Sequence, residues 1–243
     1  MHRIYCKKLN IVNQRIVITD SKETHHLLNV LRHKNGDKIE VFSEGQLIFG
    51  TIANINKETV VVNVDKMVKS DRPNTEIILA CAIPKKAKFE TIIEKCTELG
   101  VTEIIPLKTA RTELKLPKER LSKKSNRYRE VAINASKQCK RTFLPCIRDI
   151  MTFGEALQII PEDSLKLIPW LEGKRENVLD VLSAHLKSRR VVIFIGPEGD
   201  FTREEVDKAK LKGFTSVSLG NTTLKVDTAA MSVVGLVNFY FNR

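Results

Sequence analysis

Two segments in the C-terminal two-thirds of the chain, Ile77–Ile83 and Val191–Ile195, are apolar throughout instead of alternating with polar residues. Strands of this kind are buried on both faces, as in a parallel sheet covered by helices on both sides. Helix-like segments separate the strand-like ones, which is the pattern of an α/β domain. We therefore predict an α/β fold with a mostly parallel sheet for residues 73–243. Strands are expected at 76–83, 101–107, 165–171, 191–195 and 216–219, and helices at 88–99, 118–140, 153–160, 177–186, 202–212 and 229–241.

Residues 1–72 follow a different pattern, in which short segments alternate between apolar and polar side chains. Short strands with a single helix favour a small β-barrel, a shape that is common among nucleic-acid-binding domains. The polar segment Lys69–Asn74 contains Pro73, so we place a domain boundary there. Strands are expected at 15–19, 38–42, 46–55 and 59–64, and one helix at 21–33.

Composition excludes several classes of protein. A hydrophobic fraction of 42% and a charged fraction of 29% rule out intrinsic disorder and fibrous repeats. The first ten residues lack a signal-peptide core, so we expect a cytoplasmic protein. The longest uncharged run, residues 228–242, is shorter than the roughly 18 to 20 residues that a membrane span needs, and it predicts a buried helix. Scattered cysteines and histidines without metal spacing predict neither disulfides nor a metal site.

The net charge of +12 is concentrated in one part of the chain. Residues 108–141 hold 12 basic residues against three acids, whereas residues 151–243 hold 12 of each. A solvated helix face is the simpler explanation of a charge run. Next to a neutral domain, however, a local basic stretch also fits a surface that grips nucleic-acid phosphates. We predict that this stretch contributes to RNA binding.

The loop Gly196–Phe201 follows a buried strand at once and precedes a helix. Ligands in open α/β sheets bind at the carboxyl ends of strands, where such loops lie. Thr202 and Glu205 have the spacing of a capping box, which fixes the start of the helix. A second glycine-bearing loop, Ser218–Ala229, follows another strand, and the two loops together are able to enclose one flat heterocycle. The chain lacks the phosphate-binding P-loop, the dinucleotide G-x-G-x-x-G and the nucleophile elbow.

Five motifs, in order, resemble those of one family. They are HHLLNVLR with a following GD, KCTELGV, QCKR with LP, IGPEGDF, and LGNTTLKVDTA before an apolar C-terminal helix, at residues 25–37, 95–101, 138–145, 195–201 and 219–229. Each motif is weak alone, but the set spans almost the whole chain. It is similar to the RsmE family of the SPOUT superfamily of RNA methyltransferases.

The resemblance implies a PUA-like β-barrel at 1–72 and a SPOUT methyltransferase domain with a trefoil knot at 73–243. It also implies a homodimer that uses S-adenosylmethionine to methylate ring nitrogen 3 of one uridine near the decoding centre of small-subunit ribosomal RNA. The implied cofactor-binding residues are Leu171, Glu172, Gly196, Pro197, Glu198, Gly199, Leu219, Gly220, Leu224 and Lys225. The predicted RNA-binding residues are Arg32, Lys85, Lys86, Arg111, Lys137, Lys140 and Arg141.

Methylation of a uracil N–H requires a base, or a cation that stabilises the developing anion. We expect the cation to be Lys225, Arg141 or Arg111, and the proton acceptor to be Asp227 or Glu198. The segment LKVDTA departs from the arginine-rich LRxETA of the family, and lysine keeps the charge of arginine but not its planar fork.

Competing interpretations remain for both the residues and the chain. Glu198 is equally suited to holding loop amides, and Lys225 with Asp227 to forming a local ion pair. For the whole chain, the alternatives are a SPOUT methyltransferase acting on another RNA, such as transfer RNA, and a non-catalytic RNA-binding protein of ribosome assembly.

Overall fold

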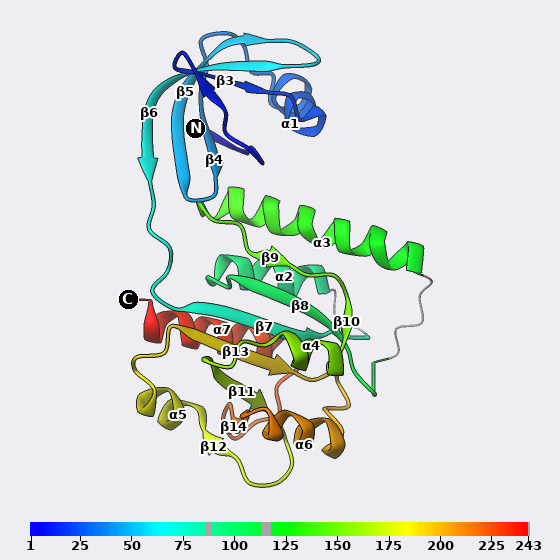
Figure 1. Cartoon of the computed structure of the whole chain (residues 1–243). Coiled ribbons are helices and arrows are strands. Elements are labelled where there is room, and N and C mark those ends of the chain that lie inside the picture. The colour runs from blue at the N-terminus through cyan, green and yellow to red at the C-terminus, as the bar shows by residue number, and fades with distance from the viewer. Residues whose placement is uncertain (86–88, 113–117, 243) are drawn as a thin grey trace. The chain divides into compact units, whose positions relative to one another are not determined.

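The computed structural model describes residues 1–85, 89–112 and 118–242, and these residues form two compact units (Figure 1). The first unit comprises residues 1–72 and 136–144, and the second comprises residues 73–135 and 145–243. Residues 136–144 were expected in the C-terminal domain, and the structure instead packs them with the N-terminal strands. Gly45 N donates to Thr142 O at 2.9 Å, and Arg3 Nη1 donates to Arg141 O at 3.1 Å.

The first unit is built on one six-stranded sheet with the order β1-β4-β5-β6-β3-β2. Only the β1–β4 pair is parallel among its pairings. Side chains that alternate along these strands place Ile16, Val41 and Ile48 in one core, as the period of two predicts. The strands are β1 (His2–Tyr5), β2 (Ile11–Val12), β3 (Arg15–Ile18), β4 (Lys38–Ser43), β5 (Gln46–Ile55) and β6 (Val60–Lys69).

The helix expected at 21–33 is shorter and changes form within this unit. Helix α1 (Ser21–His25) is capped by Asp20, whose carboxylate accepts from Lys22 N and Glu23 N. It continues as one π-helical turn, η1 (His26–Val30). The chain then leaves the helix at Arg32, which has a left-handed φ of 55°.

The second unit is an α/β domain whose eight described strands pair in parallel throughout, which confirms the predicted fold class. The sheet order is β10-β8-β7-β13-β11-β14-β12, with β9 also pairing with β8. The strands are β7 (Glu76–Ala82), β8 (Glu103–Lys108), β9 (Cys146–Ile147), β10 (Met151–Thr152), β11 (Leu165–Pro169), β12 (Glu176–Asn177), β13 (Arg190–Ile195) and β14 (Thr215–Ser218). The helices are α2 (Phe89–Glu98), α3 (Lys118–Gln138), α4 (Phe153–Ile159), α5 (Val178–Ala184), α6 (Arg203–Leu211) and α7 (Val226–Phe241).

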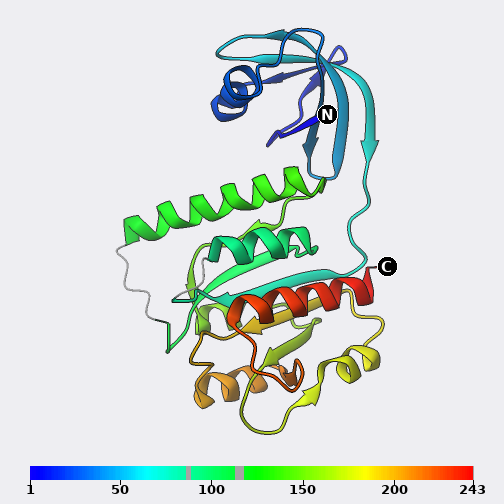
Figure 2. The ribbon, with the colours of Figure 1, turned by 180° about the vertical axis from the view of Figure 1, so that it is seen from behind.

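Helices cover both faces of this sheet (Figure 1). On one face α2, α3, α5 and α7 bury side chains such as Ile93 and Val234 against Leu79 and Ile193. Figure 2 shows α7, in red, on the same side as α2, and the two helices contact each other. On the other face α4 and α6 pack against Ala80 and Phe194. Successive residues of β7 and β13 therefore enter different cores, which explains why these strands are apolar throughout.

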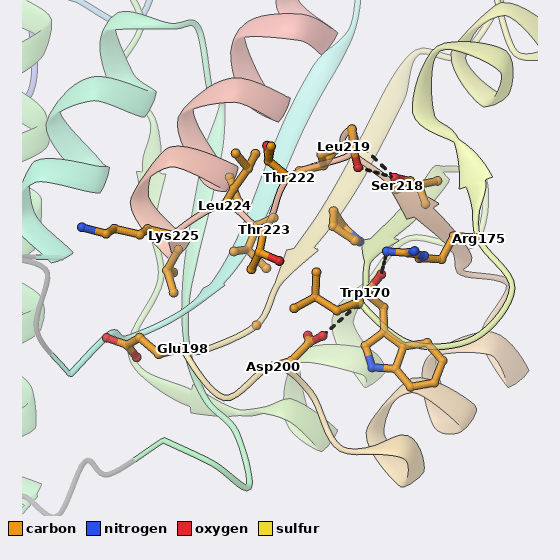
Figure 3. A pocket seen from close by; sticks show the side chains of 18 of the residues that line it. Trp170, Arg175, Glu198, Asp200, Ser218, Leu219, Thr222, Thr223, Leu224 and Lys225 are labelled. Atoms are coloured by element: carbon orange, nitrogen blue, oxygen red, sulfur yellow. Dashed lines mark hydrogen bonds between the residues drawn. The ribbon is translucent and has the colours of Figure 1, made fainter.

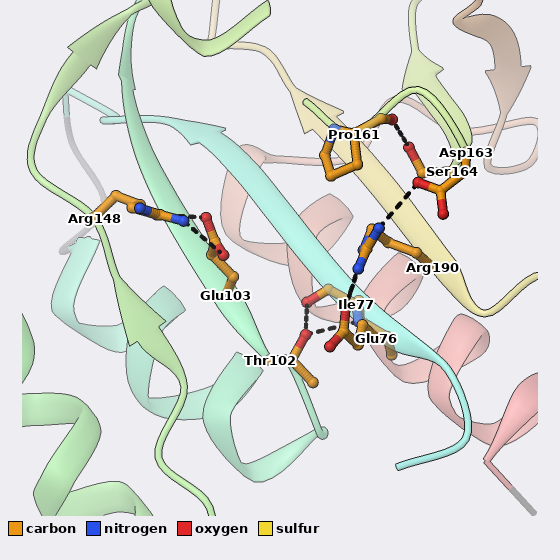
Figure 4. A network of polar contacts seen from close by, with 9 residues as sticks. All are labelled: Glu76, Ile77, Thr102, Glu103, Arg148, Pro161, Asp163, Ser164 and Arg190. Carbon is orange, nitrogen blue, oxygen red and sulfur yellow. Dashed lines mark hydrogen bonds and ion pairs between the residues drawn. The ribbon is translucent and has the colours of Figure 1, made fainter. Parts of the chain in front are cut away.

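Polar contacts tie together the amino ends of the strands, at the edge opposite to the loops that follow them (Figure 4). Arg190, at the start of β13, forms ion pairs with Glu76 at 2.8 Å and with Asp163 at 3.1 Å. Arg148 pairs with Glu103, at the start of β8, at 2.7 Å. These contacts lie at the amino ends of the strands, away from the carboxyl ends where ligands bind in sheets of this kind.

No helix in the described parts of the chain combines the length and the apolar character that crossing a bilayer would need.

Candidate functional site

A pocket of about 610 Å³ lies in the second unit at the carboxyl ends of β11, β13 and β14 (Figure 3). The loops that follow these three strands form its walls, and the start of α7 closes it. This is the edge where the sequence predicted a ligand site. Its lining residues are Pro169, Trp170, Leu171, Arg175, Ile195, Gly196, Pro197, Glu198, Asp200, Val217, Ser218, Leu219, Gly220, Asn221, Thr222, Thr223, Leu224, Lys225, Val226 and Ala229.

The loop after β13 is tightly folded. Asp200 N donates to Pro197 O at 2.9 Å and closes the turn. A Cβ atom at position 196 would lie 3.1 Å from both Phe201 N and Asp200 Oδ1, so the turn has little room for a side chain there. Phe201 is only 1% exposed and packs against Phe153, with ring centroids 5.3 Å apart. The loop is thereby anchored in the core beneath it.

The predicted capping box at the start of α6 is confirmed. Thr202 accepts from Glu205 N, and the Glu205 side chain accepts from Thr202 N at 3.0 Å. The other carboxylate oxygen of Glu205 accepts from Ala110 N at 2.9 Å. Glu205 is buried, so one side chain fixes both the helix start and the segment after β8.

The loop after β14 turns on Ser218 and Gly220. Ser218 Oγ donates to Gly220 O at 3.0 Å and accepts from Gly220 N at 3.3 Å. Gly220 has a φ of 129°, which a residue with a Cβ rarely adopts. Helix α7 starts at Val226, three residues earlier than predicted, with Lys225 at its N-cap position. The Lys225 side chain makes no capping bond and lies at the pocket wall.

The loops after β11 and β13 contribute three residues that were not predicted from the sequence as part of the site. Trp170 is buried, with Lys210 Nζ 5.3 Å from the centre of its ring. Arg175 Nη1 donates to Trp170 O at 3.4 Å, and Leu171 N donates to Asp200 Oδ2 at 2.9 Å. The signal available in the sequence was position alone: Arg175 and Asp200 follow the ends of predicted strands, and Trp170 lies near the end of the strand predicted at 165–171, which in the structure ends at Pro169.

Two hydrogen bonds join predicted RNA-binding residues to predicted cofactor-binding residues of the loop after β13. Lys85 N donates to Glu198 Oε1 at 2.9 Å, and the Arg111 guanidinium donates to Gly199 O. A Cβ at Gly199 would sit 3.4 Å from Arg111 Cδ. The contact made by Glu198 is of the kind expected if it holds loop amides.

Eight of the ten predicted cofactor residues line the pocket, and Glu172 and Gly199 do not. Asp227 is in the first turn of α7, where its carboxylate accepts from Thr228 N at 3.0 Å, and it is not among the lining residues. The ion pair considered between Lys225 and Asp227 is not formed within the described part of the chain.

The remaining predicted residues are divided between the two units. Arg32, Lys137, Lys140 and Arg141 belong to the first unit, and Lys85 and Arg111 to the second. Lys137 forms an ion pair with the buried Glu23, and burial lowers the pKa of Arg141. Lys86 lies outside the described residues.

Comparison with known proteins agrees with both units. Residues 71–238 match a family described as an RNA methyltransferase domain, and residues 18–65 match an RNA methyltransferase PUA domain. Ribosomal RNA small subunit methyltransferase E of Synechocystis sp. is 30% identical over 98% of this chain and 77% of its own length. The Bacillus subtilis protein of the same name is 28% identical over 90% and 88%.

Solved structures of similar proteins were obtained with a cofactor. Ribosomal RNA small subunit methyltransferase E from Neisseria gonorrhoeae, bound to S-adenosyl methionine, has a TM-score of 0.86 and 25% identity over 98% of this chain and 97% of its own. A Legionella pneumophila protein that was solved in complex with the bound cofactor SAM has a TM-score of 0.87 and 27% identity over 98% of this chain and 96% of its own. The match over most of the chain, together with the fold and the strand-end pocket, establishes that this chain belongs to the RsmE family of RNA methyltransferases with a PUA domain.

Proposed function

We propose that this chain transfers a methyl group from S-adenosylmethionine to ring nitrogen 3 of one uridine in small-subunit ribosomal RNA. The observation that carries the proposal is the pocket at the ends of β11, β13 and β14, in a chain whose relatives of the same fold were solved with S-adenosylmethionine. The choice of uridine as the target, and of nitrogen 3 as the methylated position, rests on the family resemblance.

The pocket residues suit S-adenosylmethionine in size and in chemistry. About 610 Å³ lies within the range of about 300 to 1,000 Å³ typical of small-molecule sites. Apolar walls from Ile195, Val217 and Leu219 suit a flat heterocycle. Within the described residues, the indole N–H of Trp170 is buried and has no hydrogen-bond partner. An acceptor atom of a bound ligand would give this donor a partner.

Charged groups of both signs line the pocket, as a ligand with an ammonium, a sulfonium and a carboxylate requires. Glu198 and Lys225 lie at one side of it, and Asp200 and Arg175 at the other (Figure 3). We assign to this site the eight predicted cofactor residues that line the pocket, and add Trp170, Arg175 and Asp200. Glu172 and Gly199 belong to the same loops without lining the pocket. When bound, the cofactor supplies a methyl group that its sulfonium makes electrophilic.

The chain's own task is to make the uracil nitrogen nucleophilic. Lys225 is the candidate for this, because it is an exposed cation that lines the pocket and its backbone caps α7, where the helix dipole adds positive potential. Positive charge at that point stabilises the anion left when N3 loses its proton. Asp227 and Glu198 both stay candidate proton acceptors. Each already accepts one backbone amide, from Thr228 and Lys85 respectively, and of the two Glu198 lines the pocket. Arg141 and Arg111 remain candidates for contacts with the RNA anion.

The RNA partner is proposed to contact exposed basic groups in both units. Arg32 and Lys140 are exposed in the first unit, and Lys85 and Arg111 in the second. We also propose a homodimer, to which the C-terminal helix contributes. Phe239 near the end of α7 is 68% exposed and offers an apolar contact to a second copy of the chain.

Calorimetry with S-adenosylmethionine and its demethylated product tests the cofactor assignment. We expect both ligands to bind at one site per chain, and loss of binding when Gly220→Val fills the loop after β14 with a side chain that its φ disfavours. A chain that binds RNA with a steep salt dependence but neither ligand would be a non-catalytic RNA-binding protein instead. Cofactor binding with methylation of transfer RNA alone would identify the other alternative.

A further inference from the structure

We propose that Asp200 is a positioning residue, whose carboxylate ties the loop after β13 to the loop after β11 and so holds two walls of the cofactor pocket together. The inference deepens the proposed function and rests on it, because the ligand concerned is S-adenosylmethionine. Asp200 lines the pocket beside Trp170 (Figure 3).

The contacts of Asp200 join residues that are distant in the sequence. Its Oδ2 accepts from Leu171 N at 2.9 Å, and its Oδ1 accepts from Phe201 N at 2.8 Å. Its own amide donates to Pro197 O at 2.9 Å. One residue therefore closes the turn of its own loop and fixes the neighbouring loop at Leu171, which also lines the pocket.

Two features of this position disfavour an aspartate. The backbone has a left-handed φ of 61°, which glycine adopts freely and which a residue with a Cβ, aspartate included, adopts at a cost. Burial raises the pKa of the carboxyl above its ordinary value of 3.8, and the nearby Glu172 raises this pKa further. The two amide hydrogen bonds and the more distant Arg111 oppose that shift without cancelling it. Arg175 and Lys210 are the other charged groups around the adjoining Trp170.

Because of these costs, a role in shaping the pocket and a purely structural role predict different effects on stability when Asp200 is replaced. Because the pKa is raised in the folded protein, ionised Asp200 lowers the free energy of unfolding at pH values above that pKa. Asp200→Gly removes a half-buried charge and relieves the left-handed backbone, but it also takes the acceptor from the amides of exposed Leu171 and buried Phe201. Because these effects oppose each other, we expect the variant to keep a stability close to that of the wild type while binding the cofactor more weakly.

The test measures cofactor affinity by calorimetry and stability by thermal unfolding for the wild type, Asp200→Gly and Asp200→Asn. We expect Asp200→Gly to raise the Kd for S-adenosylmethionine about tenfold, the scale of one hydrogen bond to a charged group. Its Tm should stay close to the wild-type value. Asp200→Asn tolerates left-handed φ and keeps one carbonyl oxygen as acceptor, so we expect an intermediate Kd. In steady-state assays KM for the cofactor should rise in Asp200→Gly while kcat is retained.

A pH series adds a second readout. Wild-type affinity should fall as pH is lowered through the raised pKa of Asp200, because protonation removes an acceptor oxygen. In Asp200→Asn this part of the pH dependence should be absent. Equal affinity in the wild type and Asp200→Gly would overturn the inference and leave the proposed function standing. A parallel fall of Tm and affinity in Asp200→Gly would also overturn it. Failure of the wild type to bind the cofactor would instead overturn the proposed function, and the inference with it.

Discussion

The backbone amide of Lys85 donates a hydrogen bond to the carboxylate of Glu198 at 2.9 Å, which joins the segment after β7 to the loop after β13. The bond gives Glu198 a positioning task. Glu198→Gln keeps an oxygen that accepts from this amide, so we expect a single-turnover rate within about threefold of the wild type. Glu198→Ala removes the acceptor and should weaken cofactor binding about fivefold. If Gln abolished methyl transfer at saturating cofactor, Glu198 would be the proton acceptor instead.

Lys225 combines a side-chain ammonium with the start of α7. Replacing it with Ala removes the charge that is proposed to stabilise the uracil anion, and should lower kcat about a hundredfold. Lys225→Arg is the matched control, since it retains the charge and restores the residue typical of the family resemblance. We expect it to keep a rate close to that of the wild type. Equal rates for Ala and wild type in single-turnover assays would remove Lys225 from the mechanism.

Thr202 caps α6 directly after the pocket loop. Thr202→Ala should lower the free energy of unfolding by about 1 kcal/mol, because one amide of the helix start loses its acceptor. The corresponding fall in Tm is about 2 to 4 °C for a domain of this size. Thr202→Ser keeps the hydroxyl and should retain most of the stability, which thermal unfolding of the three proteins would measure. A Ser variant as unstable as Ala would mean that the methyl group, not the cap, is responsible.

The basic stretch at 108–141 should act on RNA and not on the cofactor. Arg120, Lys123 and Arg127 are exposed on α3, and changing all three to Gln should weaken RNA binding. For each phosphate group that the variant no longer neutralises, the slope of log K against log salt concentration should become shallower by about 0.7 to 0.9. Calorimetry should give an unchanged affinity for S-adenosylmethionine.

A charge-matched control changes Lys187, Arg189 and Lys208 to Gln, three exposed residues in the neutral part of the chain. This control should leave RNA binding and its salt slope near wild-type values. Similar losses of affinity in both triple variants would mean that net charge alone, and not the α3 surface, governs RNA affinity.

Much of the fold was predictable because local patterns specify it. The apolar runs in β7 and β13 follow from two cores on opposite faces of the sheet, and Thr202 with Glu205 specifies a helix start by spacing alone. Strands of two residues, such as β9, are too short to show a period. Residues 136–140 were predicted as the end of a long helix, and 141–144 as the segment after it. Their place in the first unit depends on contacts with Arg3 and Gly45, more than 90 positions away.

The sequence was sufficient to predict which loops form the candidate site, but not which individual side chains make its contacts. Gly196 and Gly220 follow strands, and this order along the chain locates the pocket edge. Asp200 was missed because its importance depends on a left-handed backbone and on a bond to Leu171, 29 residues earlier. Trp170 was missed because the strand predicted at 165–171 included it, and an aromatic residue there looks the same in the sequence whether it fills a core or lines a pocket.

Nucleoside mass spectrometry of small-subunit ribosomal RNA, from a strain lacking the gene and from the same strain carrying this chain, tests the central claim most directly. We predict that N3-methyluridine is absent without the gene and restored at one position by the wild-type chain. Unaltered N3-methyluridine in the strain that lacks the gene, or its loss without restoration by this chain, would contradict the proposed function.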